Sequence, residues 1–480
     1  MYPNTPTETE KLAAQMQKDS ATAHQRLIKE YIDNHDTSKM AEGVRYYENE
    51  NDITKRVQYA VVDDVKIVDN EKTNNKIPHG WHKLLVDQKA AYLVGQPINF
   101  SADDEKLTEF INEYLGEKWD DTANELVVAA SNKGKEWLHP FIDEDGEFDF
   151  MQIPAEQCIP VYADKRNRKL AYMIRYYPHV LVDEETIRVE LSDDKQVWFY
   201  VKSNGEYIPD PSVEENPQSH FYYGAGKNMK GYGWGRVPFI KFRNNEQEKG
   251  DLAYYKQSID SFDKRVSDNQ NTLDEIQELI TILKGYDGTD LGEFQRNLRY
   301  YKTIKVDSEG GVDTLKQEMP IASIDSHLDR LRESIFTFGF GVDVGTDKFG
   351  NSPSGIALEF LYSLLDLKAS TLERKFRPAL QELMWFLCEY LSISGKGEFD
   401  YKEVDFTFKR TMMVNELEIA DIAQKSAGII SKKTILANHP WVDDLQQEMK
   451  RIEEEKEAYV DLETPIKQNK VNNNEPGKQS

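Results

Sequence analysis

The stretch that decides the fold begins with GVDVGTDKFGNSPSG at residues 341–355 and runs without a break into an apolar segment that ends at Leu391. Its first part is rich in glycine and carries aspartate and asparagine, which is typical of a loop. Ser352 is a good N-cap, and Pro353 fits the first helical position, where its missing N–H costs nothing. The junction therefore predicts a flexible loop that leads directly into a helix with a sharp start.

The segment after this loop has the periodicity of one long helix with a buried face. The apolar residues that recur at spacings of three, four and seven are Leu358, Leu361, Leu365, Leu372, Phe376, Leu380, Leu383 and Leu387. About 40 residues at about 1.5 Å each would span roughly 60 Å, whereas the usual globular helix has about 11 residues. We expect this helix to bridge separate parts of a large body, with a kink at Pro378, where a backbone hydrogen bond is lost.

Length and composition indicate a large, acidic protein with real cores. The chain has 480 residues, of which 39% are hydrophobic and 11% aromatic, enough for about three domains. Asp and Glu total 85 against 60 Lys and Arg, which leaves a formal net charge of -25. Such a charge disfavours tight nonspecific binding to nucleic-acid phosphates or anionic lipid.

The sequence predicts neither export nor a membrane span. The first residues are polar and carry no apolar core of the kind a signal peptide needs. The longest apolar run, LMWFLC at 383–388, is far shorter than the roughly 20 residues that cross a bilayer. Cys158 and Cys388 are far apart in sequence, so we expect two buried thiols in a protein assembled in a reducing cytoplasm.

The pattern along the chain changes from helical to β and back to helical, which predicts an α+β fold that is mainly helical. Helices are expected over 7–34 and within KIPHGWHKLLVDQKAAYLVGQPINF, and later over 414–427 and 441–459. Between 136 and 242, runs of period two such as EFDFMQI, LAYMIRYY, TIRVELS and QVWFYVKS predict an antiparallel sheet with turns at DEDG and SNGE.

A helical pair is expected on either side of a small insert. The helical pattern of LAYYKQSIDSFDKRVSDNQNTLDEIQELITIL gives way to a glycine-broken mixed segment that ends near Pro320. The amphipathic segment IDSHLDRLRESIFTFG follows and leads straight into the loop at 341–355. This order predicts an antiparallel stalk that carries a tip.

No catalytic, metal or cofactor site is predicted. GAGKNMKGYGWG at 224–235 combines glycines with a lysine, but it lacks the spacing and the following helix of a Walker loop. His79 and His82 are three residues apart and could share a metal, yet no other ligand pattern supports a closed site. The acidic segment from Asp443 to Glu463 is either a solvated helix face or an acidic rim that faces a nucleic-acid route.

The order of these parts resembles the portal proteins of tailed bacteriophages, in particular the subfamily typified by Bacillus siphophages. Four stretches carry the resemblance: RYYENENDI from Arg45, KIPHGWHKLLVDQKAAYLVGQPI from Lys76, FIDEDGEF with the following PVYADKRNRKLAYMIRYY, and GNSPSGIALEFLYSLLDLKASTLERKF from Gly350. They occur in the family's order over most of the chain. The resemblance therefore implies the portal fold, with wing, stem, clip and crown, assembled as a ring.

The resemblance implies a division of the chain into eight segments. These are a wing (1–245), a stem helix (246–261), a clip (262–320), a second stem helix (321–340), a tunnel loop (341–355), a long wing and crown helix (356–391), a crown (392–462) and a disordered tail (463–480).

The resemblance also implies two functional surfaces. The tunnel loop would line the DNA channel with Asp343, Gly345, Asp347, Lys348, Gly350 and Asn351. The clip would dock terminase and later connector proteins through Lys284, Tyr286, Asp290, Glu293, Arg296 and Arg299. Because Lys348 is the loop's one cation, we expect transient contacts to DNA without base readout.

The implied function is that of a ring-shaped channel at one capsid vertex for packaging and ejecting double-stranded DNA. The implied partners are further copies of the chain, normally twelve in the virion, the terminase large subunit, head-completion or adaptor proteins, and the major capsid and scaffolding proteins. The ring would assemble in the host cytoplasm and end in the virion, without a membrane, a cofactor or enzymatic activity. The alternatives are a cytoplasmic nucleotide-acting enzyme that uses the loop at Gly224, or another capsid or head-tail adaptor subunit.

Overall fold

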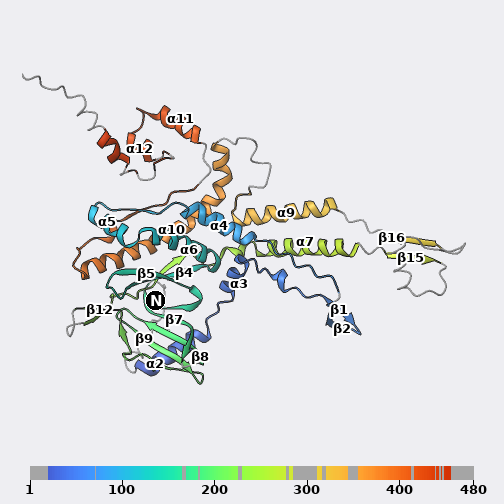
Figure 1. Cartoon of the computed structure of the whole chain (residues 1–480), viewed down its shortest axis with the longest axis horizontal. Helices are drawn as coiled ribbons and strands as arrows, with labels where there is room; N and C mark the ends of the chain where they lie inside the picture. Colours follow the sequence, from blue (N-terminus) through green and yellow to red (C-terminus); the bar gives the residue numbers. More distant parts are fainter. Residues whose placement is uncertain are drawn as a thin grey trace, which may run out of the picture. The chain divides into compact units, whose positions relative to one another are not determined.

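The computed structural model describes residues 20–70, 72–164, 169–181, 184–224, 230–276, 280–284, 311–315, 321–343, 355–411 and 416–437, together with 439, 441–442, 445 and 448–455 (Figure 1). The chain divides into two compact units. The larger unit comprises residues 1–344 and 362–411, and the smaller one comprises 345–361 and 412–480. Helices and strands both contribute, so the predicted mixed α+β class is confirmed.

Helices form much of the larger unit. They include α2 (Ser20–Asp33), α3 (Ser38–Tyr47), α4 (Trp81–Val94), α5 (Glu105–Tyr114) and α6 (Gly116–Lys133), with short 3-10 turns η1 (Asp52–Lys55), η2 (Ala155–Gln157), η4 (Asp251–Tyr254) and η6 (Tyr401–Glu403). Helix α5 starts at Asp104, whose side chain accepts the N–H groups of Lys106 and Leu107. Helix α6 ends at Gly134, where φ is +93° and a Cβ would lie 2.1 Å from the carbonyl oxygen of Glu248. Only glycine fits both that conformation and that approach.

The period-two region forms antiparallel sheets, as predicted. The largest has the order β10 (Glu206–Pro209), β9 (Gln196–Ser203), β8 (Glu184–Ser192), β7 (Leu170–Leu181) and β6 (Cys158–Tyr162), with β11 (Gln218–Ser219) also paired to β9. A second has the order β14 (Ile240–Arg243), β4 (Lys135–Ile142) and β5 (Phe148–Ile153). The remaining strands form two-stranded pairs: β1 (Tyr59–Val62) with β2 (Val65–Val68), β12 (Phe221–Tyr223) with β13 (Lys230–Tyr232), and β17 (Asp405–Thr407) with β3 (Asn99–Ser101).

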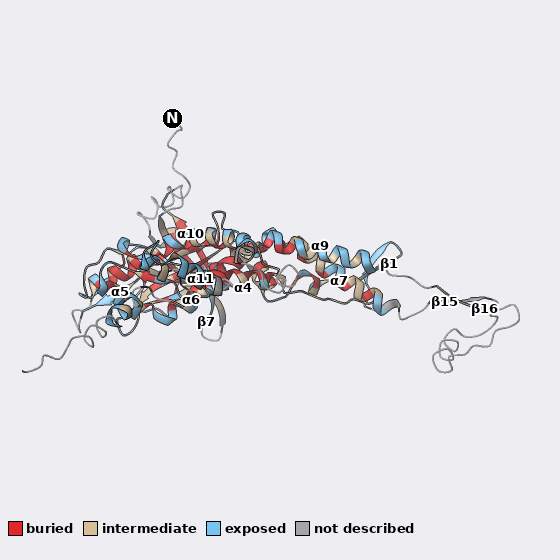
Figure 2. Cartoon of the chain, turned by 90° about the horizontal axis from the view of Figure 1, so that it is seen from above, coloured by how far each residue is buried: buried red, intermediate tan, exposed pale blue. Residues whose placement is uncertain are grey.

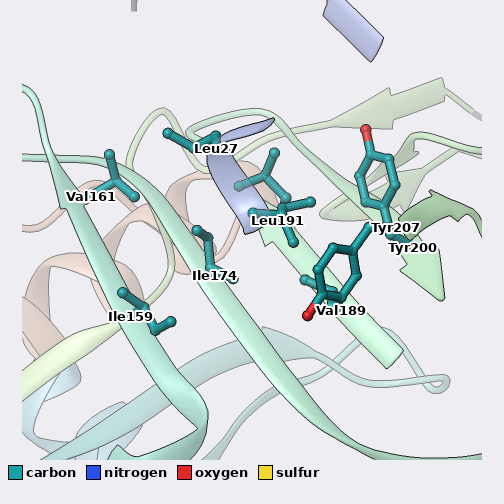
Figure 3. Close-up of a cluster of buried hydrophobic side chains, with 9 residues drawn as sticks. Leu27, Ile159, Val161, Ile174, Val189, Leu191, Tyr200 and Tyr207 are labelled. Atoms are coloured by element: carbon teal, nitrogen blue, oxygen red, sulfur yellow. The ribbon is translucent and has the colours of Figure 1, made fainter. Parts of the chain in front are cut away.

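Helix α2 covers one face of the largest sheet. Leu27 and Ile28 of the helix pack with Ile174 and Leu191, which are direct partners across β7 and β8 (Figure 3). The preceding residue of β7, Met173, is equally buried but belongs to a different cluster, on the other face of the strand. Strand β7 is therefore buried on both faces, which joins the two larger sheets.

Two long helices form a pair that leaves this body. Helices α7 (Lys256–Ile276) and α9 (Ile321–Gly339) lie side by side in both views (Figures 1 and 2). Ile259 near the start of α7 packs with Ile335 and Phe336 near the end of α9, so the helices are antiparallel. The predicted antiparallel pair is confirmed, and the chain between its helices contains the paired strands β15 (Ile280–Lys284) and β16 (Gly311–Leu315).

Two predicted boundaries in this region are wrong. The helix expected over 246–261 instead begins at Lys256 and continues to Ile276, so the boundary at 262 falls inside a helix. The segment ITIL, expected to extend the helix, forms strand β15. Its β-branched residues favour a strand, and a partner strand more than 20 residues later satisfies its backbone, which helical periodicity alone does not reveal.

The predicted long helix is confirmed as α10 (Gly355–Ile393), with 39 residues and Pro378 inside it. Its buried face includes Leu365, Leu372, Phe376, Leu380, Leu383 and Leu387, as the periodicity indicates. Its expected first residues, Ser352 and Pro353, lie outside the described residues. Cys158 and Cys388 are both free and buried, as expected.

The smaller unit includes helices α11 (Glu416–Ser426) and α12 (Lys432–Ala437). The first matches the expectation over 414–427. Of the helix expected over 441–459, residues 448–455 are helical, whereas Trp441 lies in a turn and is 77% exposed. The expected disordered tail lies outside the described residues.

A buried ion pair joins α4 to η4 inside the larger unit. The Nζ atom of Lys89 lies 2.7 Å from Asp251 and 2.8 Å from the Asn244 side chain, and Lys368 of α10 lies 2.9 Å from the same aspartate. Burial lowers the pKa of Lys89 to about 8. Although burial opposes it, the attraction of Lys368 and Lys89 lowers the pKa of Asp251 below its ordinary value, so the carboxylate stays charged.

Replacing Asp251 should destabilise the larger unit strongly. Asp251→Asn leaves two buried or nearly buried ammonium groups without a counter-charge, and breaking such a pair typically costs about 3–5 kcal/mol. Urea unfolding should therefore show a large fall in midpoint. Glu206→Gln, which breaks the exposed Lys29–Glu206 pair, is the matched control and should leave the midpoint nearly unchanged. Equal midpoints for both variants would contradict this role of Asp251.

Buried histidines should make the fold sensitive to mild acid. Burial lowers the pKa of His82 from 6.5 to about 4, and its Nδ1 atom lies 2.7 Å from the Tyr255 hydroxyl. The folded state therefore resists protonation, and the stability present above pH 6.5 is lost as the pH falls toward 4. At pH 5 the loss from this group is about 2 kcal/mol.

The free energy of unfolding, measured at pH 7.5 and at pH 5, tests this expectation. His82→Gln should reduce the difference between the two values without abolishing it, because burial also lowers the pKa of His24 and His220 to about 4. An unchanged difference would show that His82 does not contribute.

Candidate functional site: the base of the helical pair and the start of the loop

The helical pair is fixed to the body by an aromatic and aliphatic cluster at its base. Leu85 of α4, Tyr255 and Ile259 pack against Ile335 and Phe336 at the end of α9. The ring of Trp81 meets Phe262 and Phe336 edge-on, at centroid distances of 5.3 and 5.8 Å. Such contacts fix orientation as well as distance. The pair is therefore held at the end from which the loop leaves.

An extended segment, residues 74–79, runs along α7 and is hydrogen-bonded to it at regular intervals. We call this segment the strap. Its alternate backbone N–H groups donate to side chains of α7 that lie four residues apart. The bonds are Asn75 to Asn271 Oδ1 at 2.7 Å, Ile77 to Ser267 Oγ at 3.0 Å, and His79 to Asp263 Oδ1 at 3.1 Å. The strap and the helix run in opposite directions.

The spacing of alternate N–H groups along the strap matches the spacing of every fourth side chain along α7, which makes this series of hydrogen bonds possible. Two residues of extended chain advance by about 6.6 Å, and four residues of helix by about 6.0 Å. The helix side of this series, Asp263, Ser267 and Asn271, is buried although every member is polar. Asp263 also accepts from Asn51 Nδ2 at 2.6 Å and lies 2.8 Å from His79 Nδ1. The strap thus provides hydrogen-bond partners for these three buried polar side chains, and it supports α7 between Asp263 and Asn271.

The loop begins in a defined cap at the end of α9. Phe340 has φ of +56°, and the N–H of Gly341 donates to the carbonyl of Phe336 at 2.9 Å, which closes the helix in the Schellman manner. A Cβ at Gly341 would lie 2.2 Å from a methyl carbon of Leu85, so the turn fits tightly against α4.

Three side chains hold the loop's first residues. Gln88 of α4 accepts the N–H of Val342 at 3.1 Å and donates to its carbonyl at 2.8 Å. Arg332 of α9 pairs with Asp343 at 2.7 Å. Lys368 of α10 donates to the carbonyl of Gly339 at 2.8 Å. The loop therefore departs from a position fixed by α4, α9 and α10 together.

The predicted channel and docking residues are only partly described. Asp343 lies in the anchored start of the loop, while Gly345, Asp347, Lys348, Gly350 and Asn351 lie outside the described residues. Lys284 ends strand β15, and Tyr286, Asp290, Glu293, Arg296 and Arg299 also lie outside them. Their functional roles stay predictions.

Neither the buried Lys89 nor the residues that anchor the loop were predicted. A signal existed for Lys89, which follows Leu85 and precedes Leu93 by four residues each and so places a charge on an apolar helix face. Such a charge is usually paired. Gln88 and Arg332 carry no comparable signal, because a polar residue on a helix surface is ordinary.

The motifs considered for other chemistry have structural roles where they are described. His79 lies against Asp263 and His82 against Tyr255, and no group of three or more metal-ligating side chains occurs among the described residues. Within the glycine-rich segment at 224–235, residues 230–232 form strand β13, which pairs with β12, whereas a phosphate loop would lead into a helix. In the described parts of the chain, no helix is sufficiently long and apolar to cross a bilayer.

Comparison with known proteins gives one consistent result. The family described as phage portal protein, SPP1 Gp6-like, matches residues 27–461. The portal protein of Bacillus phage SPP1 is 42% identical over 472 residues, which cover 96% of this chain and 93% of that protein. The portal protein of Clostridium phage phiCD119 is 35% identical over 432 residues, which cover 86% and 91%.

Among solved structures, a chain in the virion of a native gene transfer agent particle has a TM-score of 0.43 at 11% identity, covering 75% of this chain and 88% of that one. The family match and the two relatives confirm the resemblance noted in the sequence. The chain belongs to the SPP1 Gp6-like family of phage portal proteins.

Proposed function

We propose that copies of this chain assemble into a closed ring at one capsid vertex, and that double-stranded DNA passes through the central channel during packaging and ejection. Family membership supports this proposal, because phage portal proteins are virion components. The observation that carries it is the anchored loop. A loop that starts from a base fixed by α4, α9 and α10 is suited to a constant position in a channel.

In this proposal α7 and α9 form the stem, and the insert between them forms the clip that docks terminase first and head-completion or adaptor proteins afterward. Residues 1–245 would form the wing, and the segments after α10 the crown. The strap supports the stem assignment, because it bonds α7 to the body over about two turns, from Asp263 to Asn271. Scaffolding and major capsid proteins would contact the assembled ring in the host cytoplasm.

The acidity of the chain fits this function. Twelve copies would together carry twelve times -25, or -300 formal charges. Basic surfaces bind duplex DNA by releasing its counterions, so an acidic channel lets the duplex slide where a basic one would retain it. The proposal therefore predicts weak contacts that are independent of base sequence.

Imaging the purified chain tests the ring directly. Negative-stain microscopy should show rings with a central hole in axial view, because a heterologous contact between identical copies closes when its rotation divides the circle. Native mass spectrometry should then give the number of copies. A chain that remains monomeric at assembly concentrations would overturn the proposal.

The role of the loop can be tested at its one cation. Lys348→Glu should leave the rings intact but lower the amount of packaged DNA and the infectivity, because the only attractive charge in the loop is reversed. Lys230→Glu, which makes the same change at an exposed position on β13, is the matched control and should package normally. Normal packaging by the Lys348 variant would remove this lysine from the mechanism.

A further inference from the structure

The hairpin β1–β2 exposes apolar side chains that a lone chain would bury. Tyr59, Val61, Val65, Ile67 and Val68 are between 47% and 67% exposed. The register places Tyr59 opposite Val68 on one face and Ala60 opposite Ile67 on the other. Both faces of the hairpin therefore carry exposed apolar side chains, with Lys66 opposite Val61 on the Tyr59 face, and none of these side chains is buried.

The hairpin is well formed even though it is uncovered. Its turn residues Asp63 and Asp64 have φ of +50° and +62°, as the tight type I′ turn of a two-residue hairpin requires. Figure 1 shows it standing apart from the α7–α9 pair, joined to the body by extended segments. A two-stranded hairpin is marginal in water, and exposed apolar strands with free edges favour association.

The charges of the hairpin match a second feature of the same chain. The turn carries Asp63 and Asp64, both exposed, and no ion pair joins either one to another described residue. Lys264 and Arg265 are exposed neighbours on α7, and no described carboxylate pairs with either of them. The hairpin turn and α7 thus carry opposite charges that no described residue pairs.

The chain's own hairpin is attached to α7 close to this basic pair, yet no ion pair joins its turn to Lys264 or Arg265 among the described residues. Arg56, just before β1, is bonded to Asp268 of α7 at 2.7 Å and to Asn74 of the strap at 3.0 Å. These bonds fix where the hairpin leaves the helical pair. Its turn lies beyond them, at the free end of the hairpin, where a neighbouring molecule can be reached.

We propose that the β1–β2 hairpin of one copy docks on the α7–α9 pair of the next copy, with Asp63 and Asp64 facing Lys264 and Arg265. This inference rests on the proposed ring and names the contact that closes it. Hairpin and helix are different surfaces, so the contact is heterologous, which is the kind that generates rings. The partner is a second copy of this chain because the complementary charges are its own.

Mixing two single-cysteine variants tests whether the contact is between copies. Cys158 and Cys388 are buried, so Asp64→Cys and Lys264→Cys each add one accessible thiol. A short bismaleimide applied to rings assembled from the mixture should link one variant to the other. The product should run at twice the 55.6 kDa mass of the chain on a denaturing gel. Asp103→Cys, at an exposed position before α5, replaces Asp64→Cys in the control mixture and should give little product.

Neutralising the charges tests whether they face each other. Asp63→Asn with Asp64→Asn keeps residues that tolerate the turn, and Lys264→Gln with Arg265→Gln removes the other side. Each pair of changes should weaken assembly by about fivefold per contact, the upper end for exposed ion pairs. Because the two sides act together, the combination should weaken it by the same factor and not by the product. Asp103→Asn with Glu109→Asn is the matched control, expected to assemble normally.

The possible outcomes separate this inference from the proposed function. Rings that form normally but give no mixed product, or in which the two pairs act additively, overturn the hairpin contact and leave the ring standing. Labelling of the hairpin cysteine in complete rings as fast as in a monomer also overturns it, and points to another virion protein as the occupant. A wild-type chain that forms no ring overturns both proposals.

Discussion

The architecture depends on a buried charge, the Lys89 ammonium held by Asp251 and Asn244. Taking these ions out of water costs several kcal/mol each, and their attraction offsets this cost only if the geometry is correct. The pair connects α4 to η4, the turn that leads into α7, and Lys368 brings α10 to the same carboxylate. Apolar side chains could fill this space in several arrangements, whereas the charges are satisfied in one. We infer that the network selects the relative positions of these three elements.

The same demand for satisfied polar groups explains the helical pair. A buried stripe of Asp263, Ser267 and Asn271 would destabilise α7 in isolation, because each polar group loses its water. The strap replaces that water with backbone N–H groups at matching intervals. The extended segment gains partners for its own backbone, which it could not find in a sheet. Helix and strap are therefore each incomplete without the other, and the strap supports α7 from Asp263 to Asn271, outward from the base where the loop is held.

Local patterns predicted the elements well, and contacts distant in sequence were the part that they missed. The apolar spacing of α10 and the alternation of β7 to β9 identify those elements because each records burial in neighbouring residues. The end of α7 was misplaced because ITIL is apolar in a helix or a strand, and only its pairing with β16 decides between them. The strap was missed for the same reason. Nothing in residues 74–79 reveals that their donors match polar side chains almost 200 residues later. Gln88 and Arg332 become meaningful only when the loop is seen to start beside them.

The anchored aspartate changes how charge in the loop should be considered. From sequence, Asp343 and Asp347 both oppose the single cation Lys348, but Asp343 is already paired with Arg332. The Asp343 carboxylate is already neutralised by the Arg332 guanidinium, so the loop repels DNA phosphates less strongly than its composition indicates. If twelve lysines contacted a duplex together, binding would weaken with salt by a slope of about -11, which is typical of a tight complex. A duplex held by such a tight complex could not slide. In the proposed ring, the contacts would therefore be made by a few loops at a time, because a helical duplex does not present a phosphate to every loop of a symmetric ring at once, and the net negative charge of the chain would keep each contact brief.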